Sequence, residues 1–178
     1  MVYLFLADGF EETEAIAPLD ILRRAGLSVT TIGVTGELVT GAHGITVKAD
    51  AGIDAVNKED IQAVILPGGL GGTQNLDNSG EVKGIVKYAY DFGKLVCAIC
   101  AAPSILGKMG ILRGKDATCY PGFEEYFDGG NYTAESVTKC GNIITADGMG
   151  SAYKFGFAIT SALCGENTAE EIKEQIQY

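Results

Sequence analysis

The sequence predicts an α/β fold, a three-layer sandwich in which a mostly parallel sheet has helices on both faces. Apolar runs of strand length alternate with helical segments of about a dozen residues, as crossover helices do in a parallel sheet. The chain has 178 residues, of which 47% are hydrophobic and 20% are charged, a composition typical of a globular domain. No linker, repeat or low-complexity tract divides it, so we expect a single domain over residues 1–178.

The first half of the chain begins with an expected strand over residues 2–7, which is apolar and aromatic. A helix is expected over 11–25, because its apolar residues share one face, its first turn is acidic and its last turn is basic. Pro18 lies inside this helix and predicts a kink, since proline has no N–H to donate to the carbonyl of Glu14. Further strands are expected at 28–34, 45–48 and 62–67.

The second half continues the same alternation and ends with a hairpin and two helices. In order, the expected elements are a helix at 81–92, a strand at 95–99, a helix at 102–109, a short strand at 115–119, hairpin strands at 136–139 and 142–146 around Cys140 and Gly141, and helices at 153–163 and 169–177.

Functional sites in open α/β sheets form beyond the carboxyl ends of the strands. Four segments leave strand ends in this direction: 8–14, 67–72, 100–103 and 147–150. If their strands are neighbours, these segments converge on one small pocket.

Charge and composition narrow the classes of partner. A formal net charge of −10 argues against binding to a nucleic acid backbone, which needs clustered Lys and Arg. Apolar runs are too short for a membrane span, and the first residues resemble a strand and not a signal peptide, so we expect no membrane partner and a cytoplasmic location.

The cysteine pattern indicates free thiols. Five cysteines are an odd number in a chain with a sizeable core, so reduced thiols are expected. Cys97 and Cys100 form a C-x-x-C, but Cys97 falls inside a predicted strand, and His43 is the only histidine available as a further zinc ligand. We therefore expect neither a thioredoxin-like pair nor a metal site.

Cys100 is the first candidate for chemistry. It lies where the strand at 95–99 gives way to a helix-like stretch, a turn that would place its sulfur near the positive end of a helix dipole. Backbone N–H groups at such a turn stabilise a thiolate, the reactive form of cysteine. The alternative is a buried core cysteine, because free cysteine is among the residue types most often buried.

Two other segments could assist this sulfur. Glu14 precedes the buried face of the first helix, so its carboxyl group could be desolvated and exchange a proton with a neighbouring thiol. After Pro67, glycines at 68 and 69 have two interpretations: they meet a need for positive φ angles, or they let N–H groups form an oxyanion site together with the N–H of Ala101.

Taken together, these residues resemble the ThiJ/PfpI family over nearly the whole chain. Three motifs in the right order carry the resemblance: ADGFEETEAIAPLDILRRAG at positions 7–26, VILPGGLGGTQNL at 64–76 and VCAICAAPSILGKMGIL at 96–112.

The resemblance implies a flavodoxin-like sandwich that forms a homodimer and needs no cofactor. It also implies that Cys100 is the nucleophile, that Glu14 hydrogen-bonds to its thiolate, and that Gly68, Gly69 and Ala101 provide oxyanion-binding or substrate-binding amides. Relatives have been assigned glyoxalase III and deglycase activities on methylglyoxal and its adducts, and some have been described as oxidative-stress sensors, chaperones or proteases.

The chain departs from the family pattern at several positions. Tyr120 stands where a histidine often lies near the cysteine. Ala101 stands where the protease branch has histidine, which disfavours a peptidase. Asp147 replaces an arginine found in some relatives, and His43 lies near where those relatives contribute another arginine.

The leading hypothesis is therefore a cofactor-independent enzyme of the glyoxalase III/deglycase type that acts on small reactive carbonyls. The alternative is a non-enzymatic stress-response or chaperone protein that senses oxidation of Cys100. A third possibility is a dimeric scaffold in which the cysteine has no active role.

Overall fold

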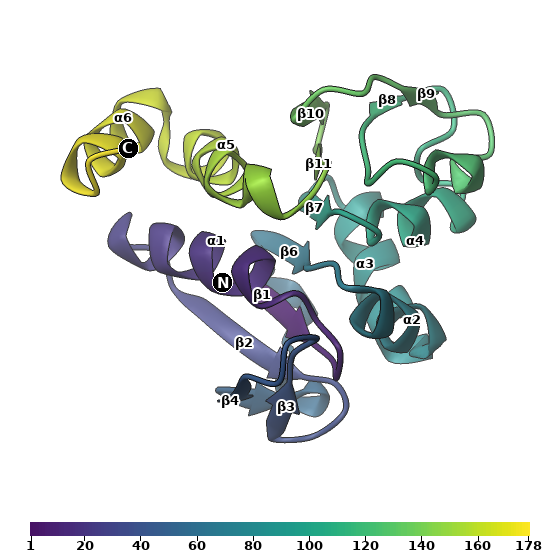
Figure 1. Cartoon of the computed structure of the whole chain (residues 1–178), viewed down its shortest axis with the longest axis horizontal. Helices are drawn as coiled ribbons and strands as arrows, with labels where there is room; N and C mark the ends of the chain where they lie inside the picture. The colour runs from purple at the N-terminus through teal and green to yellow at the C-terminus, as the bar shows by residue number, and fades with distance from the viewer.

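The computed structural model describes residues 1–178 and contains a central seven-stranded sheet in the order β10-β11-β7-β6-β1-β2-β5 (Figure 1). All neighbouring strands are parallel except β10 and β11, which form an antiparallel hairpin. The strands are β1 (Val2–Leu6), β2 (Val29–Gly33), β5 (Ala51–Gly52), β6 (Ala63–Leu66), β7 (Leu95–Ile99), β10 (Val137–Cys140) and β11 (Ile143–Ala146). The predicted mostly parallel sheet is confirmed.

Helices cover both faces of this sheet, as Figure 1 shows. One face carries α1 (Glu12–Arg24) and α5 (Ala152–Cys164), with α6 (Glu166–Gln175) packed on α5. The other carries α2 (Leu70–Asn78), α3 (Gly80–Asp91) and α4 (Pro103–Lys108). Two small sheets pair β3 (Leu38–Thr40) with β4 (Thr46–Lys48) and β8 (Asp116–Ala117) with β9 (Asn131–Tyr132); the single turns of 3₁₀ helix are η1 (Ile53–Ala55), η2 (Lys58–Asp60), η3 (Glu124–Tyr126) and η4 (Met149–Ser151).

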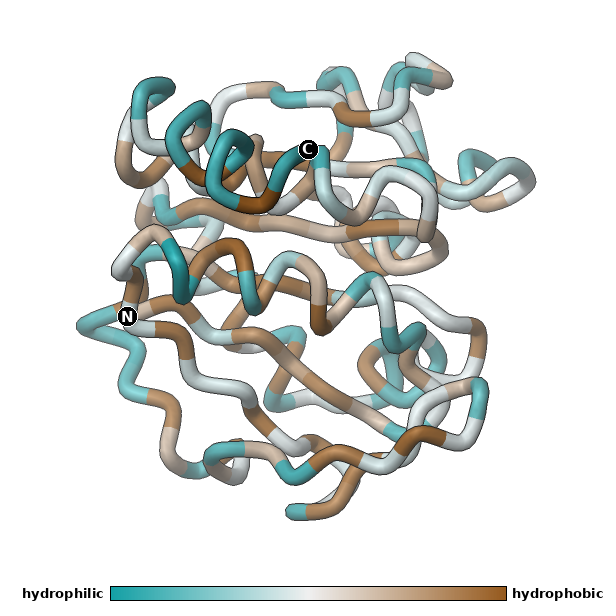
Figure 2. The backbone as a smooth tube through the Cα atoms, turned by 60° about the vertical axis from the view of Figure 1, so that its left-hand side comes forward, coloured by the Kyte–Doolittle hydropathy of each residue, from teal (hydrophilic) through white to brown (hydrophobic).

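The sheet separates two apolar clusters. One contains 23 buried residues, mainly between the sheet and α3 and α4, and the other contains 18, mainly between the sheet and α1 and α5. Side chains of a strand point alternately to opposite faces, so in β1 Tyr3 and Phe5 join the first cluster while Leu4 and Leu6 join the second. Figure 2 shows the strands that cross the molecule as predominantly hydrophobic.

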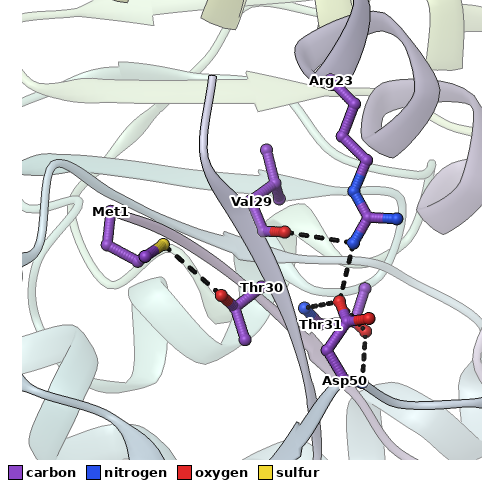
Figure 3. Close-up of polar contacts among 6 residues, drawn as sticks. All are labelled: Met1, Arg23, Val29, Thr30, Thr31 and Asp50. Atoms are coloured by element: carbon purple, nitrogen blue, oxygen red, sulfur yellow. Dashed lines mark hydrogen bonds and ion pairs between the residues drawn. The ribbon is translucent and has the colours of Figure 1, made fainter. Parts of the chain in front are cut away.

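A polar network ties the end of α1 to the edge of the sheet (Figure 3). The Asp50 carboxylate accepts hydrogen bonds from the backbone N–H and the hydroxyl of Thr31, at 2.9 and 2.8 Å, and from the Arg23 guanidinium at 2.7 Å. The same guanidinium donates to the carbonyl of Val29 at 3.1 Å. These contacts lower the pKa of Asp50, although its burial acts in the opposite direction.

Most differences from the predicted elements are shifts of one or two residues at element ends. The hairpin turn lies one position later than expected, since Cys140 is still in β10, and α6 begins three residues early, directly after Gly165. The expected strand at 115–119 contains only two residues of strand. Helix α1 continues through Pro18 without interruption. None of the helices has the length and apolar character that a transmembrane helix needs.

Helix α2 was not predicted, because its sequence begins with leucine followed by two glycines and is a weak helix former. Packing explains why the helix forms there. A Cβ added to Gly72 would lie 2.7 Å from the Cα of Phe10 and 2.8 Å from its nitrogen, so only glycine lets the helix approach the turn after β1. Strands β3, β5 and β9 were also missed, since each has only two or three residues.

Candidate active site

The candidate site lies at the carboxyl ends of β1, β6 and β7. The strand order reverses at β1, which has β2 on one side and β6 on the other, and this is where crevices form in open parallel sheets. A cavity of about 470 Å³ opens there. Its wall is formed by Gly9, Glu11, Ala42, Gly69, Leu70, Gly71, Cys100, Ala101, Tyr120 and Phe123.

The predicted convergence of loops is therefore confirmed for three of the four segments. The turn after β1, the glycine-rich turn after β6 and the turn after β7 all contribute to the cavity wall. The segment after β11 does not contribute, but Asp147 is close enough for its charge to raise the pKa of Glu14.

Cys100 has a strained backbone, with a φ of +64° that side-chain-bearing residues seldom adopt. Neighbouring segments hold it in this conformation. Its N–H donates to the carbonyl of Ala146 at 2.9 Å, and its own carbonyl accepts from the N–H of Tyr120 at 2.8 Å. These bonds fix a sharp turn between β7 and α4 and leave the side chain on the cavity wall.

Glu14 lies beside this sulfur. Its side chain is buried, with only 1% of the residue exposed, and one carboxyl oxygen accepts a hydrogen bond from the N–H of Gly68 at 3.0 Å. The thiol of Cys100 lies close enough to this carboxyl group for each to shift the pKa of the other, and a Cβ built at Gly68 would meet both residues. The structure therefore places the two candidate groups predicted from the sequence beside each other.

Gly68 allows Glu14 and Cys100 to lie this close together. A Cβ at this position would meet the Glu14 carboxyl oxygen first, and it would also lie 2.6 Å from the Cβ of Cys100 and 2.9 Å from the carbonyl oxygen of Ile99. No room exists for a side chain. Because its N–H is already bonded to Glu14, Gly68 is not a free donor for a substrate, in contrast to the expected oxyanion role.

The protonation of the pair differs from the sequence-based expectation of a thiolate. Burial raises the pKa of Glu14 to about 7. Burial and the negative charge of Glu14 raise the pKa of Cys100 to about 12, whereas the amides of Gly69 and Ala101 act to lower it. The helix expected to favour the thiolate, α4, has only six residues and begins at Pro103. Between about pH 7 and 12 the pair thus holds one proton.

The amides of Gly69 and Ala101 do lie beside the sulfur, as predicted. Both N–H groups favour the thiolate, and they can equally stabilise an oxyanion formed next to it. Gly69 has a φ of +82°, and an added Cβ would lie 2.6 Å from the nitrogen of Glu11 and 2.8 Å from the carbonyl carbon of Phe10. Glycine is therefore required at position 69 for both conformation and space.

His43 does not line the cavity that contains Cys100. Its Nδ1 lies 3.0 Å from a carboxyl oxygen of Glu12 and 3.5 Å from one of Glu11, and these neighbours raise its pKa. The side chain is 69% exposed and lies outside the cavity wall, so no Cys–His dyad forms. The ligand atoms of Glu11, Glu12 and His43 lie within 4.8 Å of one another, and hydrogen bonds between His43 and Glu12, with an ion pair between His43 and Glu11, account for this arrangement.

Tyr120 lies on the cavity wall, half exposed, as its position near Cys100 suggested. Leu70 and Phe123 were missed, and only the position of Leu70 directly after the glycine turn could have indicated it. Cys97 is fully buried inside β7, and all five cysteines are free, so the C-x-x-C is not a disulfide motif in this structure.

Comparison with known proteins gives a consistent result. A family model described as "DJ-1/PfpI family" matches residues 1–162. The chain is 37% identical to Protein dj-1beta of Drosophila melanogaster, over 95% of this chain and 92% of that protein. It is 36% identical to the Parkinson disease protein 7 homolog of Danio rerio, over 96% of this chain and 93% of that protein.

Solved structures resemble the fold closely. Oxidised Toxoplasma gondii DJ-1 superposes with a TM-score of 0.95 at 34% sequence identity, covering 99% of this chain and 97% of that one. Drosophila melanogaster DJ-1beta gives a TM-score of 0.92 at 36% identity, covering 99% of this chain and 96% of that one.

Proposed function

The chain belongs to the DJ-1/PfpI family, and we propose that it is a cofactor-independent enzyme of the glyoxalase III/deglycase type that acts on methylglyoxal-like carbonyls. One observation carries the proposal: Cys100 lies on a cavity wall beside the buried carboxyl group of Glu14, whose pKa is raised to about 7. A nucleophile beside a titrating acid–base group is the arrangement that covalent catalysis on a carbonyl requires.

Sulfur attack on the aldehyde is the first step. Above about pH 7 the pair of Cys100 and Glu14 holds one proton. Whichever of the two atoms carries it, formation of the sulfur–carbon bond leaves the proton on Glu14 and negative charge on the aldehyde oxygen. The amides of Gly69 and Ala101 stabilise that charge, and transfer of the proton to the oxygen gives a neutral hemithioacetal.

An internal hydrogen shift completes the reaction. The carboxylate of Glu14 removes the proton from the carbon bonded to sulfur, which gives an enediol as the neighbouring carbonyl oxygen takes up a proton. The adjacent carbon then receives a proton from Glu14, and the hydroxyl on the carbon bonded to sulfur loses its proton to become the thioester carbonyl. The hemithioacetal thereby becomes the thioester of lactate, with one carbon oxidised and its neighbour reduced. Water cleaves the thioester, releasing lactate and the thiol of Cys100, so methylglyoxal and water are the only reactants consumed.

The test is lactate formation from methylglyoxal by the wild type and by the Cys100→Ala and Glu14→Gln variants. We expect both variants to lose activity, because one lacks the nucleophile and the other the group that moves the proton. Cys164→Ala is the matched control, since this cysteine is exposed and lies in α5 away from the cavity. A wild-type rate no higher than that of either active-site variant would remove the enzyme proposal.

A second function uses the same sulfur as a redox sensor in a stress-response or chaperone protein. One relative of known structure is described as oxidised, and the amides of Gly69 and Ala101 would stabilise a sulfinate of Cys100. Peroxide would supply two electron equivalents of oxidation at each step, from thiolate to sulfenate and then to sulfinate. Peptide mass mapping after mild peroxide treatment tests this: oxidation of exposed Cys164 ahead of Cys100 would count against a sensor.

We further propose that residues 1–178 form one domain that acts as a cytoplasmic homodimer. A groove lined by Ile16, Ile45, Val47 and Tyr153 exposes apolar side chains that a second copy could cover. Sedimentation equilibrium measures the mass directly. A monomer at micromolar concentration would contradict the dimer.

A further inference from the structure

The cavity beside Cys100 is larger than the simplest substrate requires. Its volume is about 470 Å³, within the range of pockets that enclose drug-sized ligands. Methylglyoxal has few atoms and occupies on the order of 100 Å³, judging from the volume of about 30 Å³ per water molecule. Most of the cavity would therefore remain available for a larger substituent on the reacting carbonyl.

Large apolar and aromatic side chains from two segments form part of the cavity wall that contains Cys100. Leu70 begins α2 and is 73% exposed, although it is a large aliphatic side chain. Tyr120 is 53% exposed and belongs to the same turn as Phe123, whose N–H donates to the carbonyl of Tyr120 at 3.1 Å. Exposed apolar side chains around a cavity favour a ligand with an apolar group.

The charge of the cavity excludes acidic ligands. None of the ten residues of the wall is Lys, Arg or His, and Glu11 is one of them. The carboxyl groups of Glu11 and Asp147 are close enough to raise the pKa of Glu14, so negative charges surround the reacting atoms. An anionic substituent would meet repulsion from these carboxylates, and no cationic side chain lines the cavity wall to offset it.

We propose that Leu70, Tyr120 and Phe123 determine specificity, selecting α-oxoaldehydes that carry a neutral apolar substituent the size of a ring. This inference rests on the proposed function: the aldehyde carbon reacts with Cys100 while the substituent packs against these three side chains. Phenylglyoxal is the simplest such substrate. The same internal hydrogen shift and hydrolysis convert phenylglyoxal and water to mandelate.

The test compares kcat/KM for methylglyoxal, phenylglyoxal and 4-carboxyphenylglyoxal. We expect phenylglyoxal to exceed methylglyoxal by about tenfold, because hydrophobic pockets discriminate by at least this factor for small apolar groups. The carboxylated compound has the same ring and an added negative charge, and it should fall below phenylglyoxal. Mandelate and lactate are quantified by chromatography.

The aldehydes differ in intrinsic reactivity, so the ratio of their kcat/KM values is also compared between the wild type and variants, for which that difference is the same. Leu70→Ser and Tyr120→Ser should each lower the ratio of phenylglyoxal to methylglyoxal at least threefold, mainly through the KM for phenylglyoxal. Leu38→Ser is the control, since Leu38 is 65% exposed on β3 and lies outside the cavity wall.

Failure of the proposed function and failure of the specificity proposal give different results. If no acid forms from any substrate, the proposed function fails and the specificity proposal fails with it. If methylglyoxal is converted but the ratio is near one, or is equally affected by Leu38→Ser, the proposed function stands and the specificity proposal is overturned.

Discussion

Gly68→Ala should disrupt both the stability and the activity of this protein. The added methyl group would meet the Glu14 carboxyl oxygen, and it would lie 2.6 Å from the Cβ of Cys100 and 2.9 Å from the carbonyl oxygen of Ile99. None of these atoms can move without disrupting other contacts in the core. Glu14 is buried and bonded to the backbone of residue 68, and the other two atoms belong to the end of β7 and its sharp turn.

The magnitude follows from the cost of overpacking. Extra methyl groups in a filled core destabilise by about 1–3 kcal/mol, and three contacts below 3.0 Å place this change at the upper end, about 2–3 kcal/mol. For a chain of 178 residues, each kcal/mol lowers Tm by about 2–4 °C, so a loss of about 4–12 °C is expected. Separation of Glu14 from Cys100 should also reduce lactate formation by tenfold or more.

Gly84→Ala provides the control. Gly84 lies in α3, and an added Cβ there would have no neighbour within 4 Å, so alanine should raise the free energy of unfolding by up to about 1 kcal/mol. Thermal unfolding and lactate formation are measured on both variants. A Gly68→Ala protein with the Tm and turnover of the wild type would refute the claim that the space around Gly68 is filled.

Two further predictions concern buried and half-buried carboxylates. The folded chain retains a proton on Glu14 that the unfolded chain releases, so the free energy of unfolding should fall by about 3 kcal/mol between about pH 4.5 and pH 7. Urea unfolding across this range should show the fall in the wild type, whereas Glu14→Gln should lack it; parallel curves would contradict the raised pKa. Asp50→Ala removes the acceptor of three hydrogen bonds from Thr31 and Arg23 and should cost about 1–2 kcal/mol. Asp91→Ala breaks only an exposed ion pair within α3 and should cost about 0.5 kcal/mol or less. Equal losses for the two variants would show that the hydrogen bonds of Asp50 stabilise the fold no more than this exposed pair does.

The architecture could be predicted because its signals are local. Strand-length apolar runs and amphipathic helices follow from the spacing of side chains along a few residues, and the structure places β1, α1, β7 and α5 within one or two residues of the predicted bounds. Element α2 could not be predicted in this way. Its glycines disfavour a helix locally, and only the turn at Phe10, distant in sequence, explains why they are needed.

The candidate site shows the same division. The sequence predicted Cys100 at the end of a strand and Glu14 near the start of a helix, and the structure places the two residues beside each other. Desolvation of Glu14 was predicted, but the sequence did not reveal that the N–H of Gly68 is bonded to Glu14, or that burial also raises the pKa of Cys100. Those properties depend on how closely three chain segments approach, and no single segment encodes that distance.

The most direct test of whether Cys100 and Glu14 act as one unit is the pH dependence of kcat/KM for methylglyoxal. It is measured for the wild type and for Glu14→Gln. The active form carries one proton on the pair, so the wild-type rate should rise with pH through about 7 and then level off. Glu14→Gln should lose most of the rate together with this titration. A wild-type profile that is flat from pH 5 to 9, or the same rise in Glu14→Gln, would contradict the shared proton.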